Sequence, residues 1–313
     1  SGLLPLISAD RAVASAVESV RARPAARDAE LDLVAPAGVR PAILAGLLGA
    51  DPGPGLLVVV TATGREADDL AISLRSWAPA HADAIAVLPA WETLPHERLS
   101  PRSDTVARRL SVLRRLSHPD PDGPGGPLRV VVLPVRALLQ PVVDGLGELE
   151  PVALRAGQDA DLGQVAEALT AAAYTRVDMV ERRGEFAVRG GILDVFPPTD
   201  DHPLRVEFWG DQVEEIRWFT VADQRSLEAA DGLWAPPCRE ILLTEAVRAR
   251  AAALVDELPG IADMLVRLAE GIAVEGMESL APVLGERMLP LLDLLGDDAL
   301  LVLADPQRVR RLA

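Results

Sequence analysis

Apolar and polar positions repeat with helical and strand periods in turn along the first 150 residues. Short β-type runs at residues 31–36 (LDLVAP), 55–63, 85–90 and 128–138 are predicted strands. Amphipathic stretches between them predict helices over residues 65–77 (READDLAISLRSW) and 104–116 (DTVARRLSVLRRL). Because strands alternate with helices, this region is predicted to be an α/β domain with a mostly parallel sheet.

A different pattern begins near residue 151. Residues 159–174 predict one helix, and its apolar stripe consists of Leu162, Val165, Ala166, Leu169 and Ala173. Four β-type runs follow without a helix between them, at residues 185–190, 191–196, 204–209 and 213–219. Consecutive strands joined by tight turns form antiparallel hairpins, so this part is predicted to be an α+β unit.

Helical patterns return at residues 244–258 and 262–272, and a buried-strand run, ALLVLADP, follows at residues 299–306. A lone strand needs a sheet, and we predict that it joins the first one, which makes the hairpin unit an insertion. The expected division is a tail with a helix (1–30), a first α/β part (31–150), the α+β domain (151–230) and a second part of the split domain (231–313).

Composition narrows the function classes. The chain has 313 residues, contains no lysine and carries a net charge of −16. This negative charge argues against binding of the DNA backbone by this region alone. No apolar run reaches the roughly 18 residues of a membrane span, and we expect a cytoplasmic protein without membrane contact. The chain begins with Ser1-Gly2 rather than methionine, so we expect it to be a segment of a longer protein.

Candidate chemistry is sparse. The one cysteine, Cys238, excludes an internal disulfide, and we interpret it as an inert structural thiol. The four histidines are scattered without the spacing of metal ligands, so no metal site is predicted. We find no catalytic triad either.

The stretch VAPAGVRPA is the place to look for a nucleotide site. A phosphate loop needs the pattern GxxxxGK followed by Ser or Thr, which supplies close backbone approach, a lysine for phosphate and a hydroxyl for Mg²⁺. Here Gly38 remains, Val39 stands at the lysine position, and Arg40 followed by Pro41 stands at the hydroxyl position. We predict a degenerate loop that does not bind ATP.

The stretch LRVEFW places a tryptophan on the outer face of a predicted strand. Leu204, Val206 and Phe208 alternate with Arg205, Glu207 and Trp209, and side chains alternate faces in a strand. The apolar set is the core face, so Arg205 and Trp209 are predicted to point outward.

The strand EFAVRG shows the same alternation, with Arg189 on its outer face and Gly190-Gly191 in a turn after it. Outward arginines near an outward tryptophan have the composition of a protein-binding hot spot. The alternative is structural: Trp209 covers a sheet face or a neighbouring domain, while Arg205 and Glu207 pair in solvent.

Three blocks of sequence resemble a known family. YTRVDMVERRGEFAVRGGILDVFPP with LRVEFWGDQVEEIRWFTVADQRS resembles the hairpin domain shared by UvrB, the excision-repair helicase subunit, and the transcription-repair coupling factors (Mfd). WETLPHERLSP and GIAVEGMESLAPVL are similar to the coupling-factor version, and together the matches cover most of residues 31–306. The chain is identified as resembling the N-terminal UvrB-homology region of that family.

The resemblance implies a RecA-like helicase domain with a degenerate nucleotide site, split by a domain that binds UvrA. The family's UvrA contacts fall on Arg189, Arg205 and Trp209, and further UvrB-type contact positions fall on Arg176 and Phe208. UvrB carries an arginine where this chain has Ala187, so that contact is expected to be missing. The intact phosphate loop and the aromatic-rich β-hairpin of UvrB are also missing from the sequence.

The resemblance further implies partners of the whole family protein. RNA polymerase and double-stranded DNA bind through later domains, an ATP- and Mg²⁺-dependent translocase is among them, and a C-terminal domain masks the UvrA-binding domain. For this region no cofactor and no enzymatic activity are expected. The competing hypotheses are an NTP-dependent DNA helicase or UvrB-type damage-verification fragment, and a nucleic-acid-binding arginine face.

We therefore expect docking of Arg189 and Arg205 on acidic groups of UvrA, with Trp209 in an apolar notch. Arg205→Ala or Trp209→Ala is expected to abolish UvrA binding with little change in melting temperature.

Overall fold

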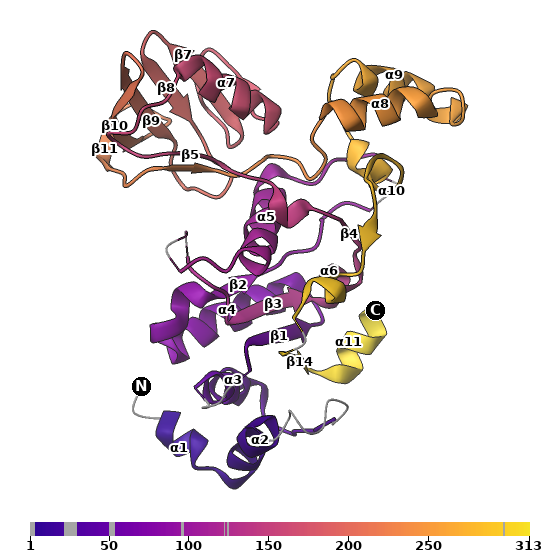
Figure 1. Cartoon of the computed structure of the whole chain (residues 1–313). Helices are drawn as coiled ribbons and strands as arrows, with labels where there is room; N and C mark the ends of the chain where they lie inside the picture. Colours follow the sequence, from indigo (N-terminus) through magenta and orange to yellow (C-terminus); the bar gives the residue numbers. More distant parts are fainter. Residues whose placement is uncertain are drawn as a thin grey trace. The chain divides into compact units, whose positions relative to one another are not determined.

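The computed structural model describes residues 4–21, 30–49, 54–94, 97–121, 123, 125–296 and 298–313. The chain divides into two compact units (Figure 1). The first unit comprises Ser1–Ala90, Arg115–Pro141 and Pro290–Ala313, and the second comprises Trp91–Arg114 and Val142–Leu289. No helix in the described ranges combines the length and apolar character that crossing a bilayer requires.

The first unit is built on a four-stranded parallel sheet with the order β14-β1-β3-β2. Its strands are β1 (Leu56–Thr61), β2 (Ile85–Val87), β3 (Val130–Pro134) and β14 (Ala299–Leu303). Leu57 and Val132 belong to the hydrophobic cluster on one face, while Val58 and Leu133, of opposite parity, are equally buried on the other. Burial on both faces is typical of a parallel sheet, and β14, almost at the end of the sequence, pairs with β1.

The first unit also contains the following helices. They are α1 (Leu4–Ser8), α2 (Arg11–Arg21), η2 (Ala37–Val39), α3 (Arg40–Leu48), α4 (Gly64–Trp77), η3 (Pro79–Ala84), α6 (Val135–Leu139), η7 (Leu291–Leu294) and α11 (Pro306–Leu312). Thr63 begins α4 as an N-cap, since its hydroxyl accepts the Glu66 N–H. Buried residues of α3 and α4 share one hydrophobic cluster with the sheet.

One predicted strand is wrong. Residues 31–36 have no strand assignment, and Leu31, Leu33 and Val34 are exposed, with Val34 completely so. The run has β-type composition, but strand formation depends on a paired neighbour more than on local propensity. The stretch VAPAGVRPA therefore does not follow a strand.

The second unit contains a six-stranded sheet with the order β11-β10-β9-β8-β7-β6 (Figure 1). Its strands are β6 (Thr175–Arg176), β7 (Glu185–Arg189), β8 (Ile192–Val195), β9 (Leu204–Trp209), β10 (Gln212–Phe219) and β11 (Ser226–Ala229). Strands β7 to β10 form consecutive antiparallel pairs, as the pattern predicts, and β6 pairs with β7 in parallel. Helix α7 (Leu162–Ala171) lies on the core face, where Val165 and Leu169 pack with Phe186 and Val206.

The second unit also carries the remaining elements. They are α5 (Ser103–Ser117, whose last turn belongs to the first unit), β4 (Val142–Val143), η4 (Leu146–Glu148), β5 (Val152–Leu154), β12 (Leu233–Ala235), α8 (Glu245–Leu254), η5 (Pro259–Ile261), α9 (Ala262–Ala269), η6 (Met277–Leu280), α10 (Ala281–Leu284) and β13 (Met288–Leu289). β5 and β12 pair in antiparallel fashion, so the chain enters and leaves the six-stranded sheet through adjacent strands.

Candidate protein-binding site

The sheet of the second unit has a core face and an outer face, and Trp209 stands on the outer one. Leu204, Val206 and Phe208 are buried, whereas 79% of the Trp209 surface is exposed. The alternation predicted from LRVEFW is confirmed. The four other tryptophans of the chain are partly buried, so Trp209 stands apart from them in its exposure.

A buried carboxylate organises the arginines of the outer face. Asp194 of β8 is 1% exposed, and the register places it directly between Ala187 of β7 and Arg205 of β9. Arg205 donates from Nε to Oδ1 at 2.7 Å and from Nη2 to Oδ2 at 2.9 Å. Arg189 donates from Nη2 to Oδ2 at 2.5 Å. The carboxylate thus holds one guanidinium in a two-point contact and a second through one nitrogen.

The two arginines differ in exposure. The Arg205 side chain is 16% exposed, lies 4.7 Å from the centroid of the Phe219 ring, and has its pKa raised chiefly by the hydrogen bond to Asp194. The Arg189 side chain is 47% exposed. The strand pattern of GILDVF does not by itself single out Asp194. Its alternation with Leu193 and Val195 places it on the face opposite to them, which is the signal that the sequence holds.

This arrangement corrects one expectation about Arg205. An outward Arg205 in solvent predicts that Arg205→Ala leaves the melting temperature nearly unchanged. The structure places the Arg205 guanidinium on a buried carboxylate, and removing one partner of such a pair leaves an undercompensated buried charge. Arg205→Ala is therefore destabilising.

Tight turns set the edge of the outer face. Gly190 ends β7 with a φ of +61°, and Gly210 follows Trp209 with the same value, a region that favours glycine. A Cβ on Gly191 would lie 2.9 Å from the Phe208 carbonyl oxygen, so only glycine lets β8 approach β9 here. The register puts Arg189, Ile192 and Glu207 in one row, between the positions of Arg205 and Trp209 along β9.

Two further predicted contact residues lie elsewhere. Phe208 is 9% exposed and belongs to the core cluster, so its side chain supports the sheet and is not offered on its surface. Arg176 is exposed, but it pairs in register with Phe186, whose side chain faces the core, and it lies on β6, the edge strand opposite β11. The structure does not bring Arg176 to the face that carries Trp209.

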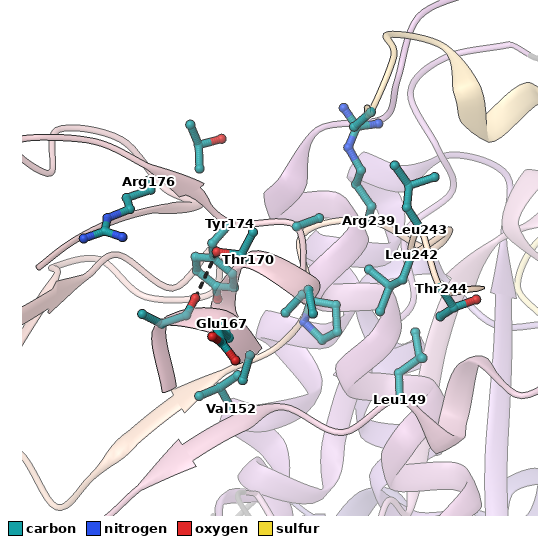
Figure 2. A pocket seen from close by; sticks show the side chains of 18 of the residues that line it. Leu149, Val152, Glu167, Thr170, Tyr174, Arg176, Arg239, Leu242, Leu243 and Thr244 are labelled. Atoms are coloured by element: carbon teal, nitrogen blue, oxygen red, sulfur yellow. Dashed lines mark hydrogen bonds between the residues drawn. The ribbon is translucent and has the colours of Figure 1, made fainter. Parts of the chain in front are cut away.

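Arg176 instead lines a wide, open groove in the second unit (Figure 2). Residues of α7, including Glu167 and Thr170, contribute to the groove together with the connection around Leu242 and Thr244. Tyr174 lines it as well, and its hydroxyl donates to the Pro236 carbonyl at 2.9 Å. Burial of Tyr174 raises its pKa, and burial raises the pKa of Cys238 to about 12, so neither group is ionised near neutral pH.

The block WETLPHERLSP packs within the second unit through hydrogen bonds to two carboxylates that are themselves in ion pairs; its Pro95 and His96 lie outside the described residues. Trp91 Nε1 donates to Glu240 Oε1 at 2.9 Å, and Arg109 Nε donates to the same oxygen at 2.5 Å. Ser100 Oγ donates to Glu278 Oε2 at 2.6 Å, and Arg239 Nη1 donates to Glu278 Oε1 at 2.6 Å. The consecutive residues Arg239 and Glu240 thus reach two separate ion-pair clusters.

The stretch with Gly38, Val39 and Arg40 forms the turn η2 and the start of α3 in the first unit. A Cβ on Gly38 would meet nothing within 4 Å, so close packing within the chain does not require glycine there. Pro41 follows at the first turn of α3 and lacks a backbone N–H.

The sequence of the chain was compared with those of known protein families and proteins. The model of the UvrB interaction domain family matches residues 152–240, which include all of β6 to β12. The transcription-repair-coupling factor of Mycobacterium bovis is 54% identical over 299 residues, or 92% of this chain. That of Myxococcus xanthus is 38% identical over 77% of the chain. The chain belongs to the transcription-repair-coupling factor family.

Members of this family are longer than the chain described here. The chain spans 24% of the Mycobacterium bovis protein and 20% of the Myxococcus xanthus protein. The UvrABC system protein B of Acaryochloris marina is also similar, with 32% identity over 36% of the chain. The resemblance expected from the sequence is thus confirmed for the coupling factors, and a shorter likeness extends to UvrB.

Proposed function

We propose that this region recruits UvrA, with the outer face of β7 to β9 as the docking surface. The observation that carries the proposal is Trp209, which is 79% exposed on the face that also presents Arg189 and Arg205. A rigid aromatic side chain beside arginines is the composition of binding hot spots. The family match over residues 152–240 supports the same segment.

The chemistry of the contact follows from the side chains. Trp209 lies on a strand paired with β8 and β10 and has two rotatable side-chain bonds, so its ring loses little conformational entropy when it enters an apolar notch. The charge of Arg189 suits a carboxylate on UvrA. Phe208 and Arg205 act mainly as supports beneath the surface, and Arg176 is outside it.

Titration calorimetry between the chain and UvrA tests the proposal. Trp209→Ala is expected to weaken binding by about 2 kcal/mol or more, because a central aromatic anchor is lost. Leu227→Ala is the matched control, since Leu227 is also exposed, at 44%, but lies on β11 at the sheet edge. Unchanged UvrA affinity of Trp209→Ala would rule the docking surface out.

We further propose that this region neither binds nor hydrolyses ATP and is related to a RecA-like helicase domain with a degenerate site. Val39 and Arg40 replace the lysine and hydroxyl residue of a phosphate loop, and Pro41 removes one N–H donor where a phosphate would sit. Titration with ATP and Mg²⁺ should give no heat. Saturable binding heat would instead favour a helicase or UvrB-type fragment.

For the whole protein, the proposal is a factor that links stalled RNA polymerase to excision repair and translocates on DNA with ATP, through parts beyond this chain. The division at residues 30, 150 and 230 remains our proposal for its domains. Residues 151–230 carry 8 arginines against 15 acidic residues, which speaks against nucleic acid as the partner of this face. A gel shift with DNA that weakens steeply with salt would revive that alternative.

A further inference from the structure

We infer that Asp194 is a positioning residue for partner binding. It holds Arg205 in place beneath the surface and orients Arg189 so that Arg189 can bind a single carboxylate on the partner. The inference rests on the proposed function and adds to it a residue that makes no partner contact itself. Asp194 is 1% exposed, so it cannot reach a partner directly. Its influence has to pass through the two arginines that it binds.

The geometry gives the two arginines unequal roles. Arg205 donates hydrogen bonds from Nε and Nη2 to the two oxygens of Asp194. Its guanidinium also lies 4.7 Å from the centroid of the Phe219 ring. Arg189 gives one nitrogen, Nη2, to Oδ2 of Asp194, and 47% of its side chain stays exposed. Arg205 is thereby held in place, while Arg189 is oriented but still open to solvent.

Charge then specifies the partner group. Asp194 can neutralise only one of the two guanidinium groups that it binds, and Glu207, in one row with Arg189, is a further acidic side chain that, after Asp194, raises the pKa of Arg205. Arg189, the more exposed of the two arginines, can still bind one carboxylate of the partner through the remaining edge of its fork. A long arginine side chain loses rotamer freedom when it binds a partner. Because Asp194 already holds Nη2 of Arg189, part of this entropy is lost before binding, and the entropic cost of binding is smaller.

A double-mutant cycle on UvrA affinity tests the role of Asp194. Asp194→Asn keeps the shape but removes the charge, and its amide nitrogen is a donor that accepts a hydrogen bond from neither arginine. Asp194→Asn is expected to weaken UvrA binding about tenfold in the otherwise unchanged chain, and less than about twofold when Arg189→Ala is already present. In a Trp209→Ala background the full loss should persist, because Trp209 acts independently.

A purely structural role predicts another outcome. If Asp194→Asn acts by loosening the fold, its effect will be the same in the Arg189→Ala and Trp209→Ala backgrounds, and the inference is overturned. Circular dichroism at the binding temperature establishes that each variant is folded. Where Asp194→Asn does not fold, Asp194→Glu, which keeps the charge but displaces it, enters the same cycle with the same expectation.

The two proposals fail differently. Loss of binding in Trp209→Ala together with additive effects of Asp194→Asn and Arg189→Ala overturns the role of Asp194 alone. Full UvrA binding by Trp209→Ala overturns the docking surface itself.

Discussion

Two clusters in the second unit join a nearly buried carboxylate to arginine and stand near a tryptophan, yet they present opposite surfaces. At Glu240, the partners are Arg109 and Trp91, and the Arg109 side chain is 0% exposed. At Asp194, the partners are Arg189 and Arg205, and Trp209 nearby on β9 is 79% exposed. The first cluster is closed and stabilises the unit, whereas the second leaves an aromatic ring and one guanidinium in solvent.

The difference teaches that residue types alone do not separate a structural cluster from a binding one. Glu240 engages both Trp91 and Arg109 through the same oxygen, and Arg109 lies 6.0 Å from the Trp91 ring centroid, so the tryptophan is part of the closed cluster. Trp209 has no comparable role beneath the surface. Substitutions should therefore separate stability from binding in the two clusters.

The largest loss of stability is expected from Glu240→Ala. Removing the carboxylate breaks the buried ion pair with Arg109, which costs about 3–5 kcal/mol in free energy of unfolding. Urea unfolding monitored by circular dichroism measures it. Glu286→Ala is the control, because the Glu286 side chain is 83% exposed and should change the same free energy by less than about 0.5 kcal/mol.

Arg205→Ala should have an intermediate effect. Asp194 keeps Arg189 as a partner, so the expected loss in free energy of unfolding is smaller, about 2 kcal/mol. Arg225→Ala provides a comparison, since the Arg225 side chain is 83% exposed. Equal melting temperatures for Arg205→Ala and Arg225→Ala would show that the contact with Asp194 contributes nothing to stability.

A smaller effect, of opposite sign, is expected at Asp200. Burial raises the pKa of Asp200 from its ordinary value of 3.8 to about 6, so folding disfavours its charged form. The stabilising contribution of the protonated form is complete below about pH 4 and disappears as the pH rises through about 6. Asp200→Asn should therefore raise the free energy of unfolding at pH 7.5 by about 1 kcal/mol.

The gain should shrink as the pH falls. Melting temperatures of Asp200→Asn and the unchanged chain, compared at pH 7.5 and pH 4.5, measure this convergence. A pH-independent difference between the two would contradict the raised pKa.

Trp209→Ala should have the smallest effect on stability. An exposed ring gives up little apolar burial when it is removed, so the free energy of unfolding should change by less than about 0.5 kcal/mol. The same variant carries the largest expected loss of UvrA affinity. A large drop in melting temperature would mean that Trp209 packs against the chain and would weaken its assignment as a docking residue.

The sequence by itself determined most elements, because periodicity records which face of each helix or strand meets the core. The strands of LRVEFW and VEEIRWF, the apolar stripe of α7 and the outward position of Trp209 all follow from alternation or helical spacing. The run ALLVLADP was predicted to join the first sheet, and β14 pairs with β1. Local pattern misled where pairing was needed, at residues 31–36, and it extended the strand predicted for residues 128–138 into α6.

Only the tertiary structure decided how the site is assembled. Asp194 meets Arg205 across adjacent strands, and that pairing depends on register, which spacing along one strand does not reveal. Register also places Arg176 away from the face that carries Trp209, although the family resemblance predicts both as contact residues. Alternation tells which side of a strand a residue occupies, but the neighbour that holds an arginine in place comes from another strand, and long-range pairing alone supplies it.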